Sequence, residues 1–431
     1  MTYEEAISYL HGLQRFGMKP GLERTQELLR RVGRPDRRAG RIIHITGTSG
    51  KGSVAAMVEA GLRAAGNRVG LYTSPSLERF TDRIQVDRRE IAPEELAELA
   101  AEVQPHVEAM VAEGLEQPTE FEVTTVLAFL HYARQHIDWL VLEVGLGGRF
   151  DATTAIDNPV VSCITNIALD HTEWLGSTHE QIAWDKAGII KPAVPCVTGT
   201  EHAGALEVIR EVALANDSVL LEVGPADYQV ISFGPAGQVV DLLGARGWYR
   251  AVELSLLGQH QASNAAVAVR VLELAGIGED AIRSGLARVL WPGRFELLQV
   301  PGGPTVLLDA AHNPAKCEAL AGAVAAYFPG RPVSLVLGVL ADKNVAGMAR
   351  PLLGLADRIW VTTPESPRRL AAAELAAVCA SLGRSVTVAD AIADAVALAL
   401  DASRPERLVV ITGSFYTVGP ARRIVVSKQD K

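Results

Sequence analysis

Along most of the chain, short apolar runs alternate with longer segments in which apolar residues recur every three or four positions. The apolar runs predict strands at 41–46, 68–73, 138–144, 159–166, 194–199 and 218–223. The periodic segments predict helices at 53–65, 93–113, 121–135, 178–187 and 203–216. Strands that are apolar on both faces and separated by helices are typical of a mainly parallel sheet covered by helices. The first part of the chain is therefore expected to be an α/β domain.

The alternation restarts later in the chain, after a change of pattern. A hairpin is predicted at 228–233 and 238–243, followed by helices near 260–275 and 279–288. Proline and glycine then cluster at 291–295 and 301–304, which is the best linker candidate. Beyond it we expect strands near 305–309, 333–338, 358–362, 385–388 and 408–412, and helices near 315–327, 345–355, 371–382 and 390–402. The pattern thus predicts domains at 1–295 and 296–431, the second a smaller, Rossmann-like α/β domain.

Composition narrows the class of protein. A length of 431 residues favours two or three domains, and 48% hydrophobic with 21% charged residues is ordinary for a globular chain. The net charge of −9 comes without a basic block, which argues against nucleic acid as a partner. No signal peptide or long apolar run is visible, so we expect no membrane span and a cytoplasmic location. The four cysteines lack metal or redox spacing and are expected to be buried thiols: Cys163, Cys196, Cys317 and Cys379.

The candidate chemistry begins at Gly47–Ser53, which follows an apolar strand and opens a helix. Glycines let backbone N–H groups turn inward on a phosphate chain, and the helix N-terminus adds partial positive charge. Lys51 can reach terminal phosphates, and Ser53 can offer a hydroxyl to Mg²⁺. Gly52 between them departs from the common nucleotide-loop spacing, and such a stretch also occurs by chance in glycine-rich linkers. The following strand, after Gly66 ends the helix, supplies the βαβ setting of a phosphate loop.

Other polar residues follow apolar runs, so they are expected at the carboxyl edge of a sheet, where α/β folds bind ligands. Glu143 ends a strand and precedes the glycine-rich segment 145–151, a position from which an acid holds Mg²⁺ or orients water. The alternative is that Glu143 has no such role and is simply a solvated residue at the end of a strand. Asp170 and His171 also follow a strand, although imidazole is an unusual partner for Mg²⁺.

The predicted helix at 178–187 is expected to open with a capping box at Ser177–Glu180. Near its end stands Lys186, which on its own reads as a solvated lysine that favours a helix C-terminus. In the second domain, polar loops that include Asp309, His312 and Asp342–Lys343 follow apolar runs. Each of these is weak alone, but together they place polar residues at one edge of a second sheet, facing a cleft.

Taken in order, these segments resemble the Mur ligase superfamily, and within it the folylpolyglutamate synthases, which are often bifunctional with dihydrofolate synthase. The glycine loop together with the blocks around Glu143 and Lys186 is specific to this family. The matching segments are collinear: Gly47–Ser53, Tyr72–Pro75, Glu143–Thr153, Leu169–Glu173, Asp185–Lys191, His260–Asn264, Pro292–Arg294, Asp309–Pro314, Gly338–Lys343 and Gly413–Tyr416.

The resemblance implies a phosphate-loop ATP-binding domain and a C-terminal glutamate ligase domain. It implies a monomeric ligase that adds L-glutamate to a reduced folate or to dihydropteroate through an acyl phosphate. ATP and Mg²⁺ are the implied cofactors, and a monovalent cation such as K⁺ is a further option. The implied nucleotide contacts are Ser49, Gly50, Lys51, Gly52, Ser53, Asn264, Arg294, Asp309 and His312. The implied catalytic residues are Lys51, Glu143, His171 and a carbamylated Lys186; the implied metal ligands are Ser53, Ser74, Glu143 and His171. The implied substrate contacts are Gly21, in the segment Lys19–Arg24, and Phe121, Glu122 and Asp151.

Three residues depart from the family's usual pattern. Ser76 stands where His is usual, Thr153 where Asn is usual, and Ser49 where Asn is frequent. Two rival functions remain: a peptidoglycan-type Mur ligase with the same chemistry, and a phosphate-loop regulatory ATPase or GTPase. The segments Gly145–Thr153 and Ser74–Pro75 favour folate over the first rival. The second rival would need no second α/β domain, and no guanine-reading Asn-Lys-x-Asp segment occurs.

Overall fold

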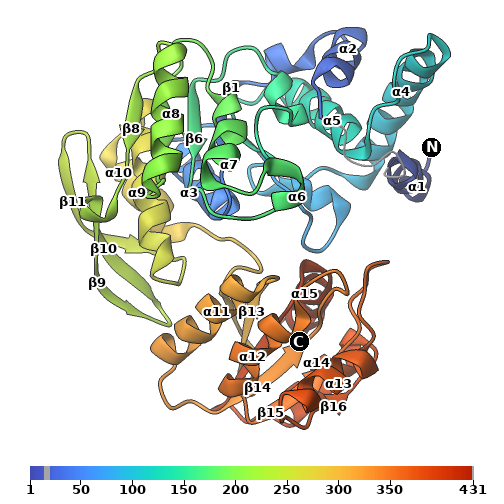
Figure 1. Cartoon of the computed structure of the whole chain (residues 1–431), viewed down its shortest axis with the longest axis vertical. Coiled ribbons are helices and arrows are strands. Elements are labelled where there is room, and N and C mark those ends of the chain that lie inside the picture. Colours follow the sequence, from blue (N-terminus) through green and yellow to red (C-terminus); the bar gives the residue numbers. More distant parts are fainter. Residues whose placement is uncertain (14–19, 430–431) are drawn as a thin grey trace.

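The computed structural model describes residues 1–13 and 20–429 and forms two α/β parts, which lie one above the other in Figure 1. The larger part is built on an eight-stranded sheet with the order β4-β3-β2-β5-β1-β6-β7-β8. Its neighbours are parallel from β2 to β8, whereas β3 and β4 are antiparallel at one edge. The strands are β1 (Arg41–Thr46), β2 (Val69–Tyr72), β3 (Ile84–Val86), β4 (Arg89–Glu90), β5 (Trp139–Glu143), β6 (Val161–Ile164), β7 (Cys196–Thr198) and β8 (Leu220–Glu222).

Helices cover both faces of this sheet because its central strands are apolar on both sides. Ile43 and Ile45 of β1 join one core cluster with α3, α9 and α10, and Ile42 joins another with α1, α2, α4 and α5. The helices are α1 (Tyr3–Leu13), α2 (Glu23–Arg31), α3 (Lys51–Ala64), α4 (Pro93–Ala112), α5 (Glu120–Gln135), α6 (Thr172–Leu175), α7 (His179–Lys186), α8 (Ala203–Ala215), α9 (His260–Leu274) and α10 (Glu279–Arg288). Short 3₁₀ turns occupy Pro35–Arg38, Phe80–Arg83, Ala152–Ala155, Ala187–Ile189 and Pro225–Asp227.

The predicted hairpin is confirmed and gains a third strand. The strands β9 (Tyr228–Gly234), β10 (Gly237–Gly244) and β11 (Gly247–Leu254) form an antiparallel sheet, and the sequence analysis missed β11. Val240, Leu242 and Val252 of this sheet are buried in the same core as α9 and α10. The small sheet is therefore an extension of the larger part of the molecule.

The smaller part is a six-stranded sheet with the order β12-β13-β17-β14-β15-β16, parallel except for β12. The predicted linker was too long, because β12 lies between its two halves and Pro301–Pro304 is the turn that joins β12 to β13. Only Val289–Phe295 crosses between the parts without regular structure. The elements are β12 (Glu296–Gln299), β13 (Thr305–Asp309), α11 (Pro314–Tyr327), β14 (Val333–Leu337), α12 (Val345–Leu355), β15 (Arg358–Val361), α13 (Ala372–Ser381), β16 (Thr387–Val388), α14 (Ile392–Asp401), β17 (Leu408–Thr412) and α15 (Phe415–Gln429).

Local predictions had mixed outcomes. The capping box of α7 is shifted by one residue from the expected Ser177–Glu180, because Thr178 is the N-cap and exchanges hydrogen bonds with Gln181. This box ties the side chain of Gln181 to the backbone before the helix, which a hydroxyl at Ser177 is one residue too early to do. All four cysteines are free and buried, as expected. Among the described helices, none has both the length and the apolarity that crossing a membrane requires.

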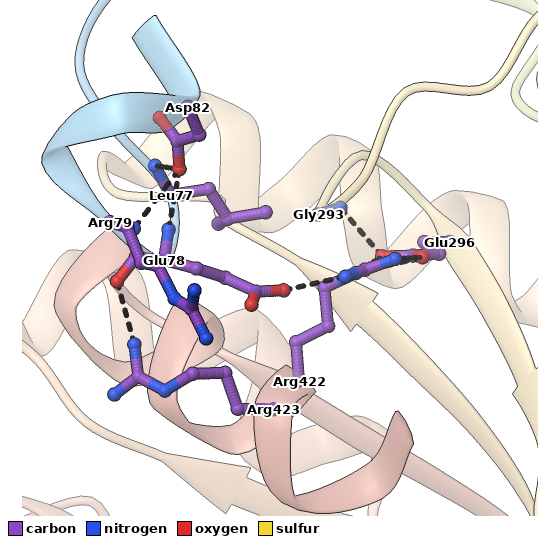
Figure 2. Close-up of polar contacts among 8 residues, drawn as sticks. All are labelled: Leu77, Glu78, Arg79, Asp82, Gly293, Glu296, Arg422 and Arg423. Atoms are coloured by element: carbon purple, nitrogen blue, oxygen red, sulfur yellow. Dashed lines mark hydrogen bonds and ion pairs between the residues drawn. The ribbon is translucent and has the colours of Figure 1, made fainter. Parts of the chain in front are cut away.

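The two parts also meet through α15, at what we call the α15 contact: Glu78, Glu296, Arg422 and Arg423 (Figure 2). The Arg422 guanidinium donates to Oε1 of Glu78 at 2.5 Å and to both carboxylate oxygens of Glu296 at 2.9 Å. Arg423 donates to the Glu78 carbonyl at 2.6 Å. The loop that carries Glu78 is itself held by Asp82, whose Oδ2 accepts three backbone N–H groups from residues 77–79.

Candidate active site

The loop between β1 and α3 depends on its glycines. Gly47 and Gly50 adopt φ values of +149° and +80°, which other residues rarely reach. A Cβ on Gly50 would lie 2.4 Å from Oδ1 of Asn264, and one on Gly52 would lie 2.5 Å from the Trp291 ring. The glycines therefore allow α9 and the interdomain linker to approach the loop closely. Asn264, which lies on α9 and is implied by the resemblance to contact the nucleotide, lies directly beside the loop.

Side chains from β6 and α9 fix the loop from outside. Asn166 accepts from the Ser49 backbone N–H at 2.9 Å and donates to the Ser49 hydroxyl at 2.8 Å. Gln261 donates to the Ser53 hydroxyl at 3.2 Å and accepts from Asn264 at 2.9 Å. Asn166 was given no role from the sequence, although a polar residue at the end of the predicted strand 159–166 was a usable signal. Because Ser49 and Ser53 already make hydrogen bonds to Asn166 and Gln261, the loop holds its shape with no contribution from a ligand.

Glu143 and Lys51 face the same region from neighbouring elements. Glu143 ends β5, is only 4% exposed, and accepts a hydrogen bond from the Ser74 backbone N–H at 3.3 Å. Burial raises the pKa of Glu143 to about 7, against the opposing effect of the Lys51 ammonium. Lys51 Nζ donates to the Gly47 carbonyl at 2.9 Å. The alternative that Glu143 is a solvated strand end is wrong, because the side chain is buried. A cation nearby would favour the ionised form of this carboxylate.

The predicted metal ligands come from four separate segments. Ser53, Ser74 and Glu143 offer oxygen atoms, the donor type that Mg²⁺ prefers. His171 begins α6 with φ +50° and is half exposed, and its Nε2 lies 4.0 Å from Asp170 Oδ1. Burial lowers the pKa of His171, which favours a neutral imidazole. Within residues 1–13 and 20–429, no three His, Cys, Asp or Glu side chains gather as a metal cluster, and the metal assignment stays a prediction.

Lys186 is buried at the end of α7, so its interpretation as a solvated last-turn lysine is wrong. It is 3% exposed, and burial, reinforced by the Lys51 charge, lowers its pKa to about 7. A Cβ on Gly148 would lie 2.8 Å from the Lys186 Cα, so the glycine-rich loop packs directly on this end of the helix. The Arg149 N–H bonds the Asp185 carbonyl at 2.8 Å across the same junction. A lysine amine with such a pKa is partly neutral near pH 7 and can act as a nucleophile.

The linker contributes Arg294, and the second domain contributes Asp309 and His312. Asp309 ends β13 and accepts from the Phe295 N–H at 2.8 Å. Burial lowers the pKa of Arg294, and the Asp309 carboxylate opposes this. The Arg294 guanidinium lies 4.5 Å from the Phe415 ring centroid. His312 Nδ1 bonds the Ala310 carbonyl at 2.8 Å, and burial lowers the pKa of His312 to about 3. The three predicted residues thus lie on the linker and on the end of β13, next to the larger part.

A cavity of about 1750 Å³ adjoins this region. Its wall comes from α1, the loop 74–80, the start of α5, the glycine-rich loop and α7, and from the second domain through α15. Ser74 and three of the predicted substrate residues line it, namely Phe121, Glu122 and Asp151. Gly21 is not in the wall, although Pro20 is, and Lys19 lies outside the described residues.

Two of these carboxylates have partners within the protein. Glu122 pairs with Arg24 at 2.9 Å and accepts from the Thr119 N–H at 2.7 Å, which closes the capping box of α5. Asp151 accepts from the Leu146 N–H at 3.0 Å and from the Thr153 hydroxyl at 2.6 Å. They therefore shape the cavity wall as well as facing it.

Sequence reasoning missed several lining residues. Arg83 is 7% exposed, donates to Glu120 at 2.7 Å, and has a buried Nε with no hydrogen-bond partner in the described part of the chain. Its guanidinium lies 5.6 Å from the Phe121 ring centroid. Tyr416 and Arg423 reach the wall from α15. Tyr416 lies in the matching segment Gly413–Tyr416 but was given no role there, and no local pattern marked Arg83 or Arg423, because only the tertiary structure brings these side chains to the cavity.

Comparison with known proteins gives a consistent result. Residues 45–272 match the Mur ligase middle domain, and residues 293–415 match the Mur ligase glutamate ligase domain. The Bacillus subtilis dihydrofolate synthase/folylpolyglutamate synthase is 36% identical over 98% of this chain and 99% of its own. The crystal structure of folylpolyglutamate synthase from Thermotoga maritima matches with a TM-score of 0.89 and 37% identity, covering 99% of this chain and 97% of that one. Escherichia coli FolC in complex with DHPP and ADP matches with a TM-score of 0.83 and 32% identity, covering 98% of each chain.

Proposed function

The chain belongs to the Mur ligase family and, within it, to the folylpolyglutamate synthases and dihydrofolate synthases, and on this premise we propose that it is an ATP-dependent ligase that joins L-glutamate to a folate. One observation carries the proposal. The phosphate loop Gly47–Ser53 and the buried Glu143 lie at one sheet edge, with the buried Lys186 near enough for the Lys51 charge to act on it, beside a cavity of about 1750 Å³. Such a cavity has room for a large organic substrate next to a nucleotide.

The nucleotide is assigned to the phosphate loop and the second domain. The related FolC structure holds ADP and DHPP together, so one chain of this fold takes a nucleotide and a second ligand at once. In this chain Ser49–Ser53 would hold the triphosphate, with Asn264 beside the loop. Arg294 from the linker, and Asp309 and His312 from the second domain, would also contact the nucleotide.

The folate is assigned to the cavity. Phe121 and Arg83 offer an aromatic face and a buried guanidinium at its wall. Glu122 and Asp151 shape that wall through their hydrogen bonds to the protein. Because Tyr416 and Arg423 complete the cavity from α15, substrate binding depends on both domains.

The reaction has two steps, and both place negative charge on transferring oxygens. A folate carboxylate attacks the γ-phosphorus of ATP, giving an acyl phosphate and ADP. The α-amine of L-glutamate then attacks the acyl carbon, forms the amide and expels phosphate. Lys51 and the backbone N–H groups of the loop stabilise the charge on the phosphoryl oxygens, and the two domains exclude water that would hydrolyse the acyl phosphate.

Mg²⁺ is the proposed metal, held by Ser53, Ser74, Glu143 and His171. When bound it would neutralise charge on the triphosphate. The raised pKa of Glu143 supports this, because a buried carboxylate gains from a cation beside it. A monovalent cation such as K⁺, a monomeric state and a cytoplasmic location remain predictions.

Lys186 is proposed to carry a carbamate. Its buried amine has a pKa lowered to about 7, so a substantial neutral fraction is available to add CO₂. The product would exchange a buried cation for an oxygen-bearing anion. That change would also remove the repulsion between the Lys186 and Lys51 ammonium groups, which contributes to the lowered pKa of Lys186.

The experiment that tests the function is ADP release in the presence of L-glutamate, with and without each member of a folate panel. The panel contains dihydropteroate, tetrahydrofolate and its one-carbon forms. We expect ADP release that needs both L-glutamate and a folate. A peptidoglycan precursor is assayed alongside the panel. ADP release with that precursor, but with none of the folates, would indicate the first rival. Release that needs neither substrate would indicate a regulatory ATPase.

A further inference from the structure

Lys316 occupies an unusual position in the second domain. It stands in the third position of α11, after the N-cap Asn313, whose side chain accepts from the Lys316 N–H at 2.9 Å. A helix N-terminus carries partial positive charge, so a lysine in its first turn is unfavourable unless an anion lies nearby. Among the described residues, Asp170 is the anion whose charge acts most strongly on Lys316.

His312 holds the Lys316 ammonium in one place. The Lys316 Nζ lies 3.0 Å from Nε2 of His312, while Nδ1 of the same ring lies 2.8 Å from the Ala310 carbonyl. Because a carbonyl only accepts, Nδ1 carries the proton and Nε2 presents its lone pair. The lysine therefore donates one N–H to Nε2 and keeps its other donors for a further partner.

The surroundings of Lys316 bring charges of both signs together from both parts of the molecule. The pKa of Lys316 is lowered to about 8, mainly by burial and with a contribution from the nearby cations Arg294 and Lys51. Asp170 and Asp309 act in the opposite direction. Cations that converge from two domains repel one another until an anion lies between them.

We propose that Lys316 is a further phosphate-binding residue, which contacts a terminal phosphoryl oxygen of ATP from the second domain while His312 positions it. The inference rests on the proposed function and extends its nucleotide site by one residue. A carboxylate of L-glutamate offers the same anionic oxygen. The phosphate is favoured because Lys51 of the phosphate loop is among the charges that act on Lys316, and the triphosphate is the anion held by that loop.

The test is the affinity of the full chain for AMPPCP and for ADP, measured by calorimetry for wild type and Lys316→Met. The variant keeps an unbranched side chain, one atom shorter, and loses the charge. We expect AMPPCP to bind about tenfold more weakly and ADP within about threefold of wild type, with an unchanged KM for L-glutamate. The matched control is Glu318→Gln, an exposed residue of the same helix, which is expected to change neither affinity.

Each outcome decides the inference. A loss confined to AMPPCP supports it, and Lys316→Arg, which keeps the charge, should then recover most of the affinity. Equal affinities of wild type and Lys316→Met for AMPPCP overturn it, as does a rise in the KM for L-glutamate alone. If thermal unfolding measurements show that Lys316→Met is not folded, Lys316→Gln takes its place. If wild type binds neither nucleotide, the proposed function fails together with the inference. If only the comparison with Lys316→Met fails, the inference fails and the proposed function stands.

Discussion

The two domains meet in two places that treat charge in opposite ways. At the α15 contact every charge has a partner, since Arg422 lies between Glu78 and Glu296 with distances of 2.5–2.9 Å (Figure 2). Around the phosphate loop the cation Lys51 of the larger part comes near Arg294 of the linker. There the pKa of Glu143 is raised to about 7 and that of Lys186 is lowered to about 7.

The difference separates a structural interface from a ligand site. Opposite charges that pair within the protein stabilise the arrangement of the domains and need no ligand. Like charges and buried ionisable groups that lack partners cost stability, and that cost is recovered when a ligand or modification neutralises them. Substitutions at the phosphate-loop side should therefore reduce activity with little loss of stability. Substitutions at the α15 contact should do the reverse.

Lys51→Ala is expected to have the largest effect. Removing the ammonium proposed to contact the phosphates should lower kcat by about 10²- to 10³-fold, because on that proposal its charge acts where negative charge develops. The thermal unfolding midpoint should fall little, since Asn166 and Gln261 still hold the loop when the Lys51 bond to the Gly47 carbonyl is lost. Lys428→Ala, at an exposed position of α15, is the control for loss of one lysine. Near-normal turnover in a folded Lys51→Ala variant would remove the phosphate loop from the mechanism.

Lys186→Ala should follow, with a loss of about a hundredfold in kcat. A carbamate supplies an anion that alanine cannot, and a small carboxylate added to the assay is expected to restore part of the activity. Intact mass under native conditions should show active wild type heavier by one CO₂, and Lys186→Ala without that addition. A free amine in fully active enzyme would contradict the carbamate.

The sequence was a good guide wherever function depends on consecutive residues. The predicted strands and helices are present because apolar periodicity reports burial directly, and the phosphate loop and Glu143 lie at the expected sheet edge. What it did not predict depends on tertiary contacts. The burial of Lys186 requires the glycine-rich loop to pack on α7, and the arrival of Tyr416 at the cavity requires the docking of α15. The edge strands β3 and β4 were missed because they are too short to show a period.

The pH dependence of Mg²⁺ binding sharpens the comparison further. Burial raises the pKa of Glu143 to about 7, so the carboxylate is ionised and able to bind a cation above that pH and becomes protonated below it. Affinity for Mg²⁺ should therefore be constant above about pH 8 and fall by about tenfold per pH unit below about pH 6. Titration of Mg²⁺ at constant ionic strength measures this. Glu143→Gln should bind Mg²⁺ weakly at every pH, and a pH-independent affinity in wild type would contradict the assignment.

Arg422→Met tests the other side of the comparison. The guanidinium makes charged hydrogen bonds to two carboxylates and is mostly buried, so its removal leaves Glu78 and Glu296 close together without a cation. We expect a loss of about 2 kcal/mol in the free energy of unfolding and a change in kcat of less than about threefold. Denaturant unfolding and steady-state kinetics on the same preparation measure both. A large loss of kcat with unchanged stability would mean that the α15 contact belongs to the active site.

The smallest effect is expected at Ser76, the clearest departure from the family pattern. Ser76 lines the cavity assigned to folate, two residues from Glu78 of the α15 contact and on the same loop as Ser74. Ser76→His adds volume and a hydrogen-bond group to the cavity wall without reaching the phosphate loop. The KM for folate should change by about threefold to tenfold, with the KM for ATP and kcat within about twofold. Ser76→Ala, which only removes the hydroxyl, separates added volume from a lost hydrogen bond. If the KM values for folate and L-glutamate stay constant while ATP kinetics change, this loop acts on the nucleotide, and the division between the two interdomain regions fails at this position.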